Sequence, residues 1–190
     1  MTQLARRHLL FGRFRQAGQG AVLPFRPPWS LAWTDEAAFA AACSRCDACI
    51  AACPAGVLTR GDGGFPEVNF AAAGCTLCRA CVAACRDGAF AADAAEPWNL
   101  AVAFTEACLP GRGVECRTCG EHCEAGAIRF RPRLGGAPLP ALDVDACTGC
   151  GACVPVCPAG AIEPRRRTAG SSPLPVAERA SAPLFPTEAP

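Results

Sequence analysis

The hydrophobic pattern of the chain consists of short apolar runs separated by turn residues, and it predicts short helices and strands. Residues 35–42 predict a helix that ends before the first cysteine. Residues 57–58 and 67–70 flank the glycine-rich segment 61–64, which is a hairpin signal. Residues 89–90 are expected to form the return strand of this first unit.

The second half of the chain repeats this plan. Residues 128–130 and 139–144 are expected to pair around the turn at 135–136, and residues 161–163 mirror the first return strand. Alternating apolar residues predict a strand that enters the second unit: Trp98, Leu100, Val102 and Phe104. For Trp98 we expect a role in the core rather than in electron relay.

Residues 1–34 form a basic arm that has no acidic residue. Its arginines are Arg6, Arg7, Arg13, Arg15 and Arg26. The pattern is compatible with a docking helix or with a loosely packed terminus. The apolar face of such a helix comprises Leu4, Leu9, Leu10, Phe11 and Phe14. Arg6-Arg7 superficially resembles an export signal, but residues 11–30 lack the apolar run and cleavage site of one, so we expect a retained, cytoplasmic arm.

Composition narrows the possible functions. The chain has 190 residues, a net charge of +1 and 51% hydrophobic residues, but much of that fraction is alanine and cysteine. The cores are therefore expected to be thin, and the fold is expected to need bound metal for its stability. No apolar run is long enough to span a membrane. Basic charge is not sustained along one face, which disfavours nucleic-acid binding. Residues 164–190 begin with an arginine triplet and are expected to form a disordered, solvated tail.

The sixteen cysteines form four blocks. Three blocks read C-x2-C-x2-C-x3-C, namely Cys43, Cys46, Cys49 and Cys53; Cys75, Cys78, Cys81 and Cys85; and Cys147, Cys150, Cys153 and Cys157. The remaining block is stretched and comprises Cys108, Cys116, Cys119 and Cys123. The intact spacing is the one that binds [4Fe-4S] clusters in bacterial ferredoxins. Sixteen thiolates suffice for up to four clusters, so we expect all sixteen cysteines to be ligands.

The fourth cysteine of each block is expected to serve the neighbouring cluster. It has helical i, i+4 spacing from the third cysteine, and in two-cluster ferredoxins it ligates the other cluster. Four ligand sets follow, called sets one to four below. Set one is Cys43, Cys46, Cys49 and Cys85; set two is Cys75, Cys78, Cys81 and Cys53. Set three is Cys108, Cys116, Cys119 and Cys157; set four is Cys147, Cys150, Cys153 and Cys123.

Other uses of the cysteines fit the spacing less well. Structural zinc prefers isolated C-x2-C pairs, and a disulfide framework needs an oxidising compartment. We therefore predict an α+β fold with two tandem bacterial-type 2×[4Fe-4S] ferredoxin-like units, at residues 35–97 and 98–163. In the stretched block, Pro110-Gly111 is expected to let the loop swing, which makes the third cluster the most labile. His122 can hydrogen-bond a cluster sulfur, but an exposed helix position is the simpler interpretation.

The chain resembles the NapF ferredoxin-type family over roughly residues 5–163. The resemblance rests on the four cysteine blocks and on several further segments: Arg6-Arg7, Arg26-Pro27-Pro28-Trp29, and residues 45–49, 63–70, 114–119 and 128–132. It implies a cytoplasmic accessory protein of the periplasmic nitrate reductase system. The implied partner is the precursor of the molybdenum-containing catalytic subunit, NapA, whose maturation the family is thought to assist.

The mode of action stays open between the donation of electrons and the donation of a cluster. Two further hypotheses are an electron-carrier subunit between redox enzymes and a binding chaperone whose clusters only fix its shape. A catalytic activity of its own is not expected, because the chain shows no nucleotide-binding glycine loop, no Ser-His-Asp set and no paired acids.

Overall fold

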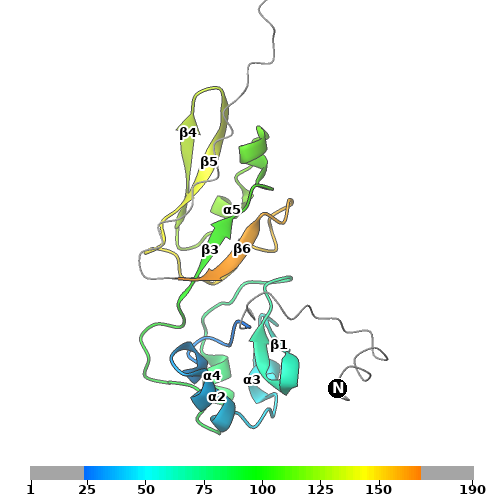
Figure 1. The fold of residues 1–190 in the computed structure, drawn as a ribbon, viewed down its shortest axis with the longest axis vertical. Helices are drawn as coiled ribbons and strands as arrows, with labels where there is room; N and C mark the ends of the chain where they lie inside the picture. Colours follow the sequence, from blue (N-terminus) through cyan, green and yellow to red (C-terminus); the bar gives the residue numbers. More distant parts are fainter. Residues whose placement is uncertain (1–23, 168–190) are drawn as a thin grey trace, which may run out of the picture.

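The computed structural model of the protein describes residues 24–167, in two units that follow one another along its longest axis (Figure 1). The first unit contains η1 (Leu31–Trp33), α2 (Glu36–Ala42), α3 (Ala48–Ala51), β1 (Leu58–Arg60), η2 (Asp62–Gly64), β2 (Pro66–Val68) and α4 (Ala80–Ala84). The second contains β3 (Leu100–Phe104), η3 (Leu109–Arg112), α5 (Thr118–Glu121), β4 (Ile128–Arg133), β5 (Gly136–Leu142) and β6 (Ile162–Arg166). The apolar face expected over residues 4–14 and the chain beyond residue 167 lie outside the described residues.

The first unit begins with the helix that the sequence predicts. Asp35 caps α2, and its Oδ1 accepts hydrogen bonds from the backbone N–H groups of Ala37 and Ala38 at 2.9 and 3.0 Å. The helix ends at Ala42 because Cys43 adopts an extended conformation. The predicted hairpin is also confirmed, since β1 pairs antiparallel with β2 across the glycine-rich turn.

The predicted return strand at residues 89–90 does not form. Phe90 makes one isolated antiparallel bridge, to Ser30. The pairing cannot extend, because Trp29 has a positive φ of 58° on one side of Ser30 and η1 begins on the other. In the second unit, a full antiparallel pair of strands, β3 and β6, stands in the position that corresponds to this bridge.

Residues 24–34 pack against the first unit. Arg26 is buried and forms an ion pair with Glu36, which stands in the first turn of α2. Its guanidinium also lies over the rings of Phe39 and Phe65. The segment Arg26-Pro27-Pro28-Trp29 is therefore an integral part of the first unit rather than a separate arm.

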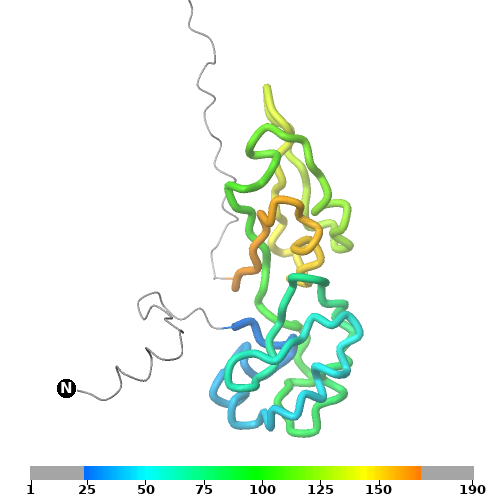
Figure 2. Tube along the Cα trace, turned by 90° about the vertical axis from the view of Figure 1, so that its right-hand side faces the viewer, coloured from blue at the N-terminus to red at the C-terminus, as the bar shows by residue number. Residues whose placement is uncertain are grey.

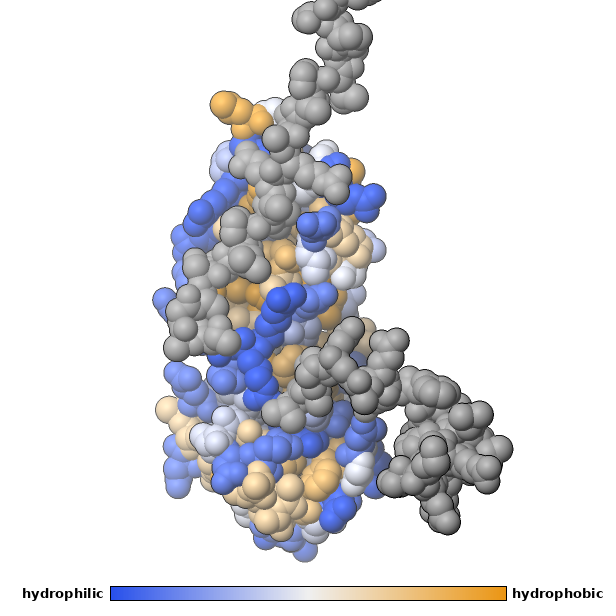
Figure 3. Space-filling view, viewed as in Figure 1, coloured by the Kyte–Doolittle hydropathy of each residue, from blue (hydrophilic) through white to orange (hydrophobic). Residues whose placement is uncertain are grey.

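The second unit contains two antiparallel strand pairs. β3 pairs with β6 from Leu100 opposite Arg166 to Phe104 opposite Ile162, which confirms the strand predicted to enter this unit. β4 and β5 form the predicted hairpin, with a register shift between Arg131 and Arg133. The hairpin turns at the far end of the molecule, where Leu134 is fully exposed, and the space-filling view shows only a small apolar projection there, flanked by hydrophilic residues (Figure 3).

Ordered structure continues beyond Glu163. β6 runs to Arg166, and its guanidinium lies 4.5 Å from the Trp33 ring centroid in the first unit. Arg167 donates from Nε to the Leu100 carbonyl and from Nη2 to the Cys147 carbonyl. These arginines, expected to begin a solvated tail, instead fasten the last strand to both units.

Thin cores lie between the short elements. The core of the second unit includes Val102, Ile128, Leu142 and Ile162. A further core at the boundary between the units contains Val57, Phe70, Trp98 and Leu100, so the expected core role of Trp98 is confirmed. Cysteines contribute directly to these cores. Among the described residues, no helix has the length and apolar character that a membrane crossing requires.

Candidate iron–sulfur sites

The structure brings the sixteen cysteines together in four groups. Four cavities are each lined by four cysteines, and their membership is that of sets one to four. The cavities are similar in size, at about 320 to 370 Å³ including the space at their mouths. Each set takes three cysteines from one block and its fourth from the partner block of the same unit.

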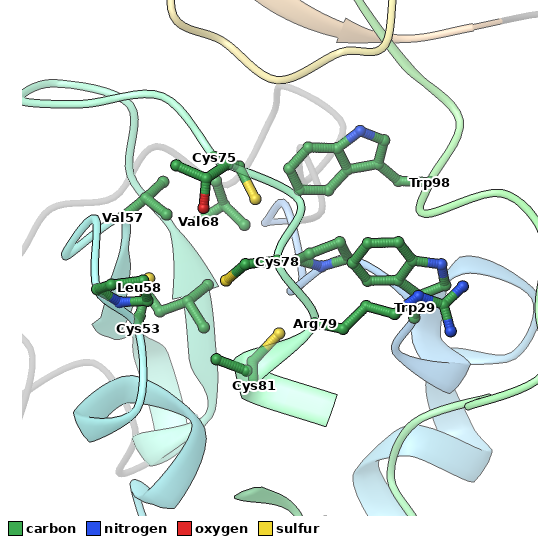
Figure 4. Close-up of a pocket in the computed structure, with 14 residues that line it drawn as sticks. Trp29, Cys53, Val57, Leu58, Val68, Cys75, Cys78, Arg79, Cys81 and Trp98 are labelled. Carbon is green, nitrogen blue, oxygen red and sulfur yellow. The ribbon is translucent and has the colours of Figure 1, made fainter. Parts of the chain in front are cut away.

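Short helices produce this exchange in the first unit. α3 carries Cys49 and is followed by Cys53, while α4 carries Cys81 and ends at Cys85. In both cases the cysteine on the helix and the one that follows it are four residues apart, and they line different cavities. In the cavity of set two, Cys75, Cys78 and Cys81 turn their sulfur atoms toward a common space (Figure 4).

The loops before these helices depend on left-handed backbone conformations. The residues before and after the second cysteine have positive φ values in three blocks: Arg45 and Asp47, Leu77 and Arg79, and Gly149 and Gly151. Two left-handed residues so close together curl the loop, so that successive cysteines face one cavity. Glycine adopts this conformation without steric cost, whereas other L-residues pay roughly 1–2 kcal/mol each.

The stretched block reaches its cavity by another route. Residues Leu109–Arg112 form η3, and Gly113 ends it with a φ of 86°. Pro110 is buried, and its carbonyl accepts a hydrogen bond from Arg133 Nη2 on β4 at 2.8 Å. Contrary to the expectation from Pro110-Gly111, this segment is not a free hinge, because the hairpin holds it. Cys108 is 8% exposed and lies in the cavity of set three.

The protein surroundings raise the pKa of some cysteine thiols and lower that of others. Burial raises the pKa of Cys49 to about 11 and that of Cys81 and Cys153 to about 12, with neighbouring cysteine charge adding to each shift. By contrast, the backbone N–H groups of Ala48 and Ala80 lower the pKa values of the exposed thiols Cys46 and Cys78. The buried thiols therefore ionise at neutral pH only when metal replaces their protons.

The donor chemistry of these cavities fits a [4Fe-4S] cluster. Four sulfur ligands surround each cavity, and Cys75 Sγ and Cys157 Sγ accept backbone hydrogen bonds at 3.4 and 3.2 Å. Backbone N–H groups directed at ligand sulfurs are one of the means by which proteins tune such clusters. Within residues 24–167, no group of three or more His, Cys, Asp or Glu side chains is arranged to hold a single metal ion.

Several residues near the sulfurs could not be assigned from the sequence. Trp29 and Trp98 line the cavity of set two and lie beside its cysteines (Figure 4). The guanidinium of Arg79 stacks on Trp29 at 4.4 Å. The tryptophans stand out in the sequence, but nothing in it places them next to a cysteine block. His122 is exposed, lines the cavity of set four, and has Nδ1 2.9 Å from the Thr118 carbonyl.

Comparison with known proteins agrees with this arrangement. The family profile of the 4Fe-4S dicluster domain matches residues 42–89 and 113–161. These two tandem matches include every cysteine except Cys108, which precedes the second match. The chain thus carries 4Fe-4S dicluster domains with cysteines for up to four [4Fe-4S] clusters.

Curated relatives cover most of the chain. It is 46% identical over 158 residues to the ferredoxin-type protein NapF of Escherichia coli K12, spanning 83% of this chain and 92% of that protein. With NapF of Haemophilus influenzae it shares 42% identity over 168 residues, or 85% and 94% of the two chains. The ferredoxin-type protein NapG of Haemophilus influenzae is 34% identical over 158 residues, covering 71% and 55%. No solved structure is significantly similar. With this identity over nearly the full length of two NapF proteins, the chain belongs to the NapF ferredoxin-type family.

Proposed function

We propose that the protein is a cytoplasmic polyferredoxin that assists the maturation of the nitrate reductase catalytic subunit NapA before its export. In this proposal all sixteen cysteines are cluster ligands, grouped as sets one to four. The observation that carries the proposal is the presence of four similar sulfur-lined cavities in a chain of the NapF family. When bound, [4Fe-4S] clusters supply one-electron transfer.

The geometry favours the donation of electrons over the donation of a cluster. Each set takes cysteines from two blocks, and each includes at least one buried thiol or a thiol with a burial-raised pKa. Release of a cluster would require the two blocks of a unit to separate, and would leave apolar core contacts broken. An electron can leave without any such movement. A permanent carrier between two redox enzymes is the alternative function that shares this property.

The ligand assignment is tested by anaerobic preparation of the full chain. Iron and acid-labile sulfide should approach four clusters per chain, with the visible absorption of iron–sulfur clusters that bleaches on reduction. Colourless protein that contains zinc, or disulfides in place of sulfide, would refute the assignment.

The maturation role is tested by anaerobic capture from cells grown with nitrate. The tagged protein should retain the signal-bearing precursor of NapA. A tagged variant with Cys46→Ala and Cys78→Ala, which removes one ligand each from sets one and two, serves as a matched control for dependence on the clusters. Recovery of mature redox enzymes without the precursor would instead support the carrier function.

A further inference from the structure

The boundary between the units joins the loop of set two to the loop of set four. The backbone N–H of Cys75 donates to the carbonyl of Cys150 at 2.7 Å. Between the two sulfur atoms, the path therefore consists of covalent bonds within two cysteines and a single hydrogen bond. The two loops lie against each other where the units meet (Figure 2).

Small residues allow this close approach. A Cβ on Gly74 would lie 2.6 Å from the backbone N and Cα of Ala152, so the two loops touch backbone to backbone. A Cβ on Gly151 would lie 2.3 Å from the ring of Phe70. Any side chain at these glycines would push the loops apart, because backbone atoms and a buried ring cannot move aside easily.

Trp98 fastens the same boundary. It lines the cavity of set two, is 4% exposed, and its Nε1–H donates to the carbonyl of Thr148 in the loop of set four at 2.8 Å. Its ring packs edge-to-face on Phe70, with 6.0 Å between the ring centroids. Trp98 therefore lines the cavity of set two and is hydrogen-bonded to the loop of set four.

We propose that this boundary is the electronic junction between the two units, with Cys75 and Cys150 as its contact and Trp98 as its positioning residue. The inference rests on the proposed ligation of clusters by the cysteines. Cys75 of set two and Cys150 of set four meet at this boundary, and sets one and three each share their cysteine blocks with the other set of their own unit, so the sets follow one another in the order one, two, four, three.

One electron crosses the junction in each transfer. With clusters bound, set two would hold the donor of that electron and set four its acceptor, or the reverse. No bond forms or breaks and no proton moves. Electrons that enter the first unit can therefore reach the stretched third block at the opposite end of the molecule.

The order of the sets is tested in full-length variants that retain two sets each. The first, Cys43→Ala, Cys46→Ala, Cys108→Ala and Cys116→Ala, retains sets two and four. The second, Cys43→Ala, Cys46→Ala, Cys147→Ala and Cys150→Ala, retains sets two and three. Both are loaded anaerobically, reduced with dithionite and compared by electron paramagnetic resonance, after assay confirms that each holds half the iron of the parent.

The spectrum of the first variant should show magnetic interaction between its two reduced centres, and that of the second should be the sum of two isolated signals. Equal interaction in both variants, or none in the first, overturns the inference. A parent chain without iron and sulfide refutes the proposed function itself, so the two failures are distinguishable.

Point variants of the complete chain test the junction without removing any ligand. Gly74→Ala should weaken the interaction signal while iron content is retained. Gly61→Ala is its control, because the added Cβ there meets only the movable carboxylate of Glu67. Trp98→Phe should have the same effect as Gly74→Ala, because the hydrogen bond from Nε1 to the Thr148 carbonyl is lost. Spectra unchanged in both Gly74→Ala and Trp98→Phe would contradict the junction.

Discussion

Arg26 and Glu36 form an ion pair in the first unit, with 2.7 Å between Nη2 and Oε1. The arginine is 7% exposed, and its guanidinium lies 5.4 and 5.2 Å from the ring centroids of Phe39 and Phe65. A buried cation needs such partners, because removal from water is costly. The pair therefore fixes the segment before η1 on the helix that leads into the first cysteine block.

Substitution of Glu36 by Gln should weaken the first unit. The guanidinium of Arg26 would lose a charged acceptor, which should lower the apparent free energy of unfolding by about 1–2 kcal/mol. Urea unfolding of the anaerobically loaded protein measures this change. Glu163→Gln is the matched control, because its pair with Arg165 is exposed on both sides and should contribute less than about 1 kcal/mol. Equal effects of the two substitutions would contradict a structural role for Arg26.

Gly149→Ala should destabilise set four by more than the strain of an alanine at a positive φ accounts for. An added Cβ would lie 2.6 Å from the Leu100 carbonyl oxygen and 2.8 Å from Trp98 Nε1. Gly160→Ala is the control, since Gly160 also has a positive φ but faces open space. We expect a loss of about 1–2 kcal/mol in the control and a larger loss, with less iron bound, for Gly149→Ala. Urea unfolding and iron assay together separate the two contributions.

Cys108→Ala should reduce the iron content by one cluster. The side chain lies in the cavity of set three although it precedes the second dicluster match, so its role as a ligand depends on the structure. Iron and sulfide assays of the anaerobically prepared variant measure the loss, and Cys119→Ala from the same set is the comparison. Unchanged iron in Cys108→Ala alone would show that set three has another fourth ligand.

Arg133→Gln should accelerate the loss of iron from set three when the loaded protein meets a chelator. The substitution removes the guanidinium that binds the Pro110 carbonyl at 2.8 Å and so frees the stretched segment. Arg131→Gln on the same strand is the control, because Arg131 is exposed. Time courses of iron release give the rates. Identical rates in the two variants would mean that the hairpin does not protect set three.

Cluster loading should be favoured by rising pH between about 7 and 9. The pKa values of Cys81 and Cys153 are raised to about 12 by burial and by nearby cysteine charge, so these thiols hold their protons throughout that range. Iron must displace the protons, and each unit rise in pH lowers the cost of releasing one proton by about 1.4 kcal/mol. Proton release during anaerobic reconstitution in weak buffer measures the coupling. Loading that is independent of pH would contradict it.

The cysteine spacing predicted the grouping around four cavities because it is the spacing of two-cluster ferredoxins, in which the fourth cysteine of each block serves the other cluster. The two hairpins and α2 were predictable for a similar reason, since their turn and cap residues act locally. By contrast, the single bridge between Ser30 and Phe90 and the fastening of Arg166 and Arg167 depend on contacts between segments far apart in the sequence. Local patterns carry no information on such contacts. The same reason explains why Trp98 was predicted as a core residue but not as the donor to Thr148.

The exchange of cysteines between blocks has a consequence for partial occupancy. Cys49 on α3 and Cys53 just after it line different cavities of the first unit, and so do Cys81 on α4 and Cys85 at its end. A cluster inserted into one cavity therefore also positions two ligands of the other. The second insertion then costs less conformational entropy than the first. When iron is scarce, a population of molecules therefore divides into units that are complete and units that are bare, with few in between.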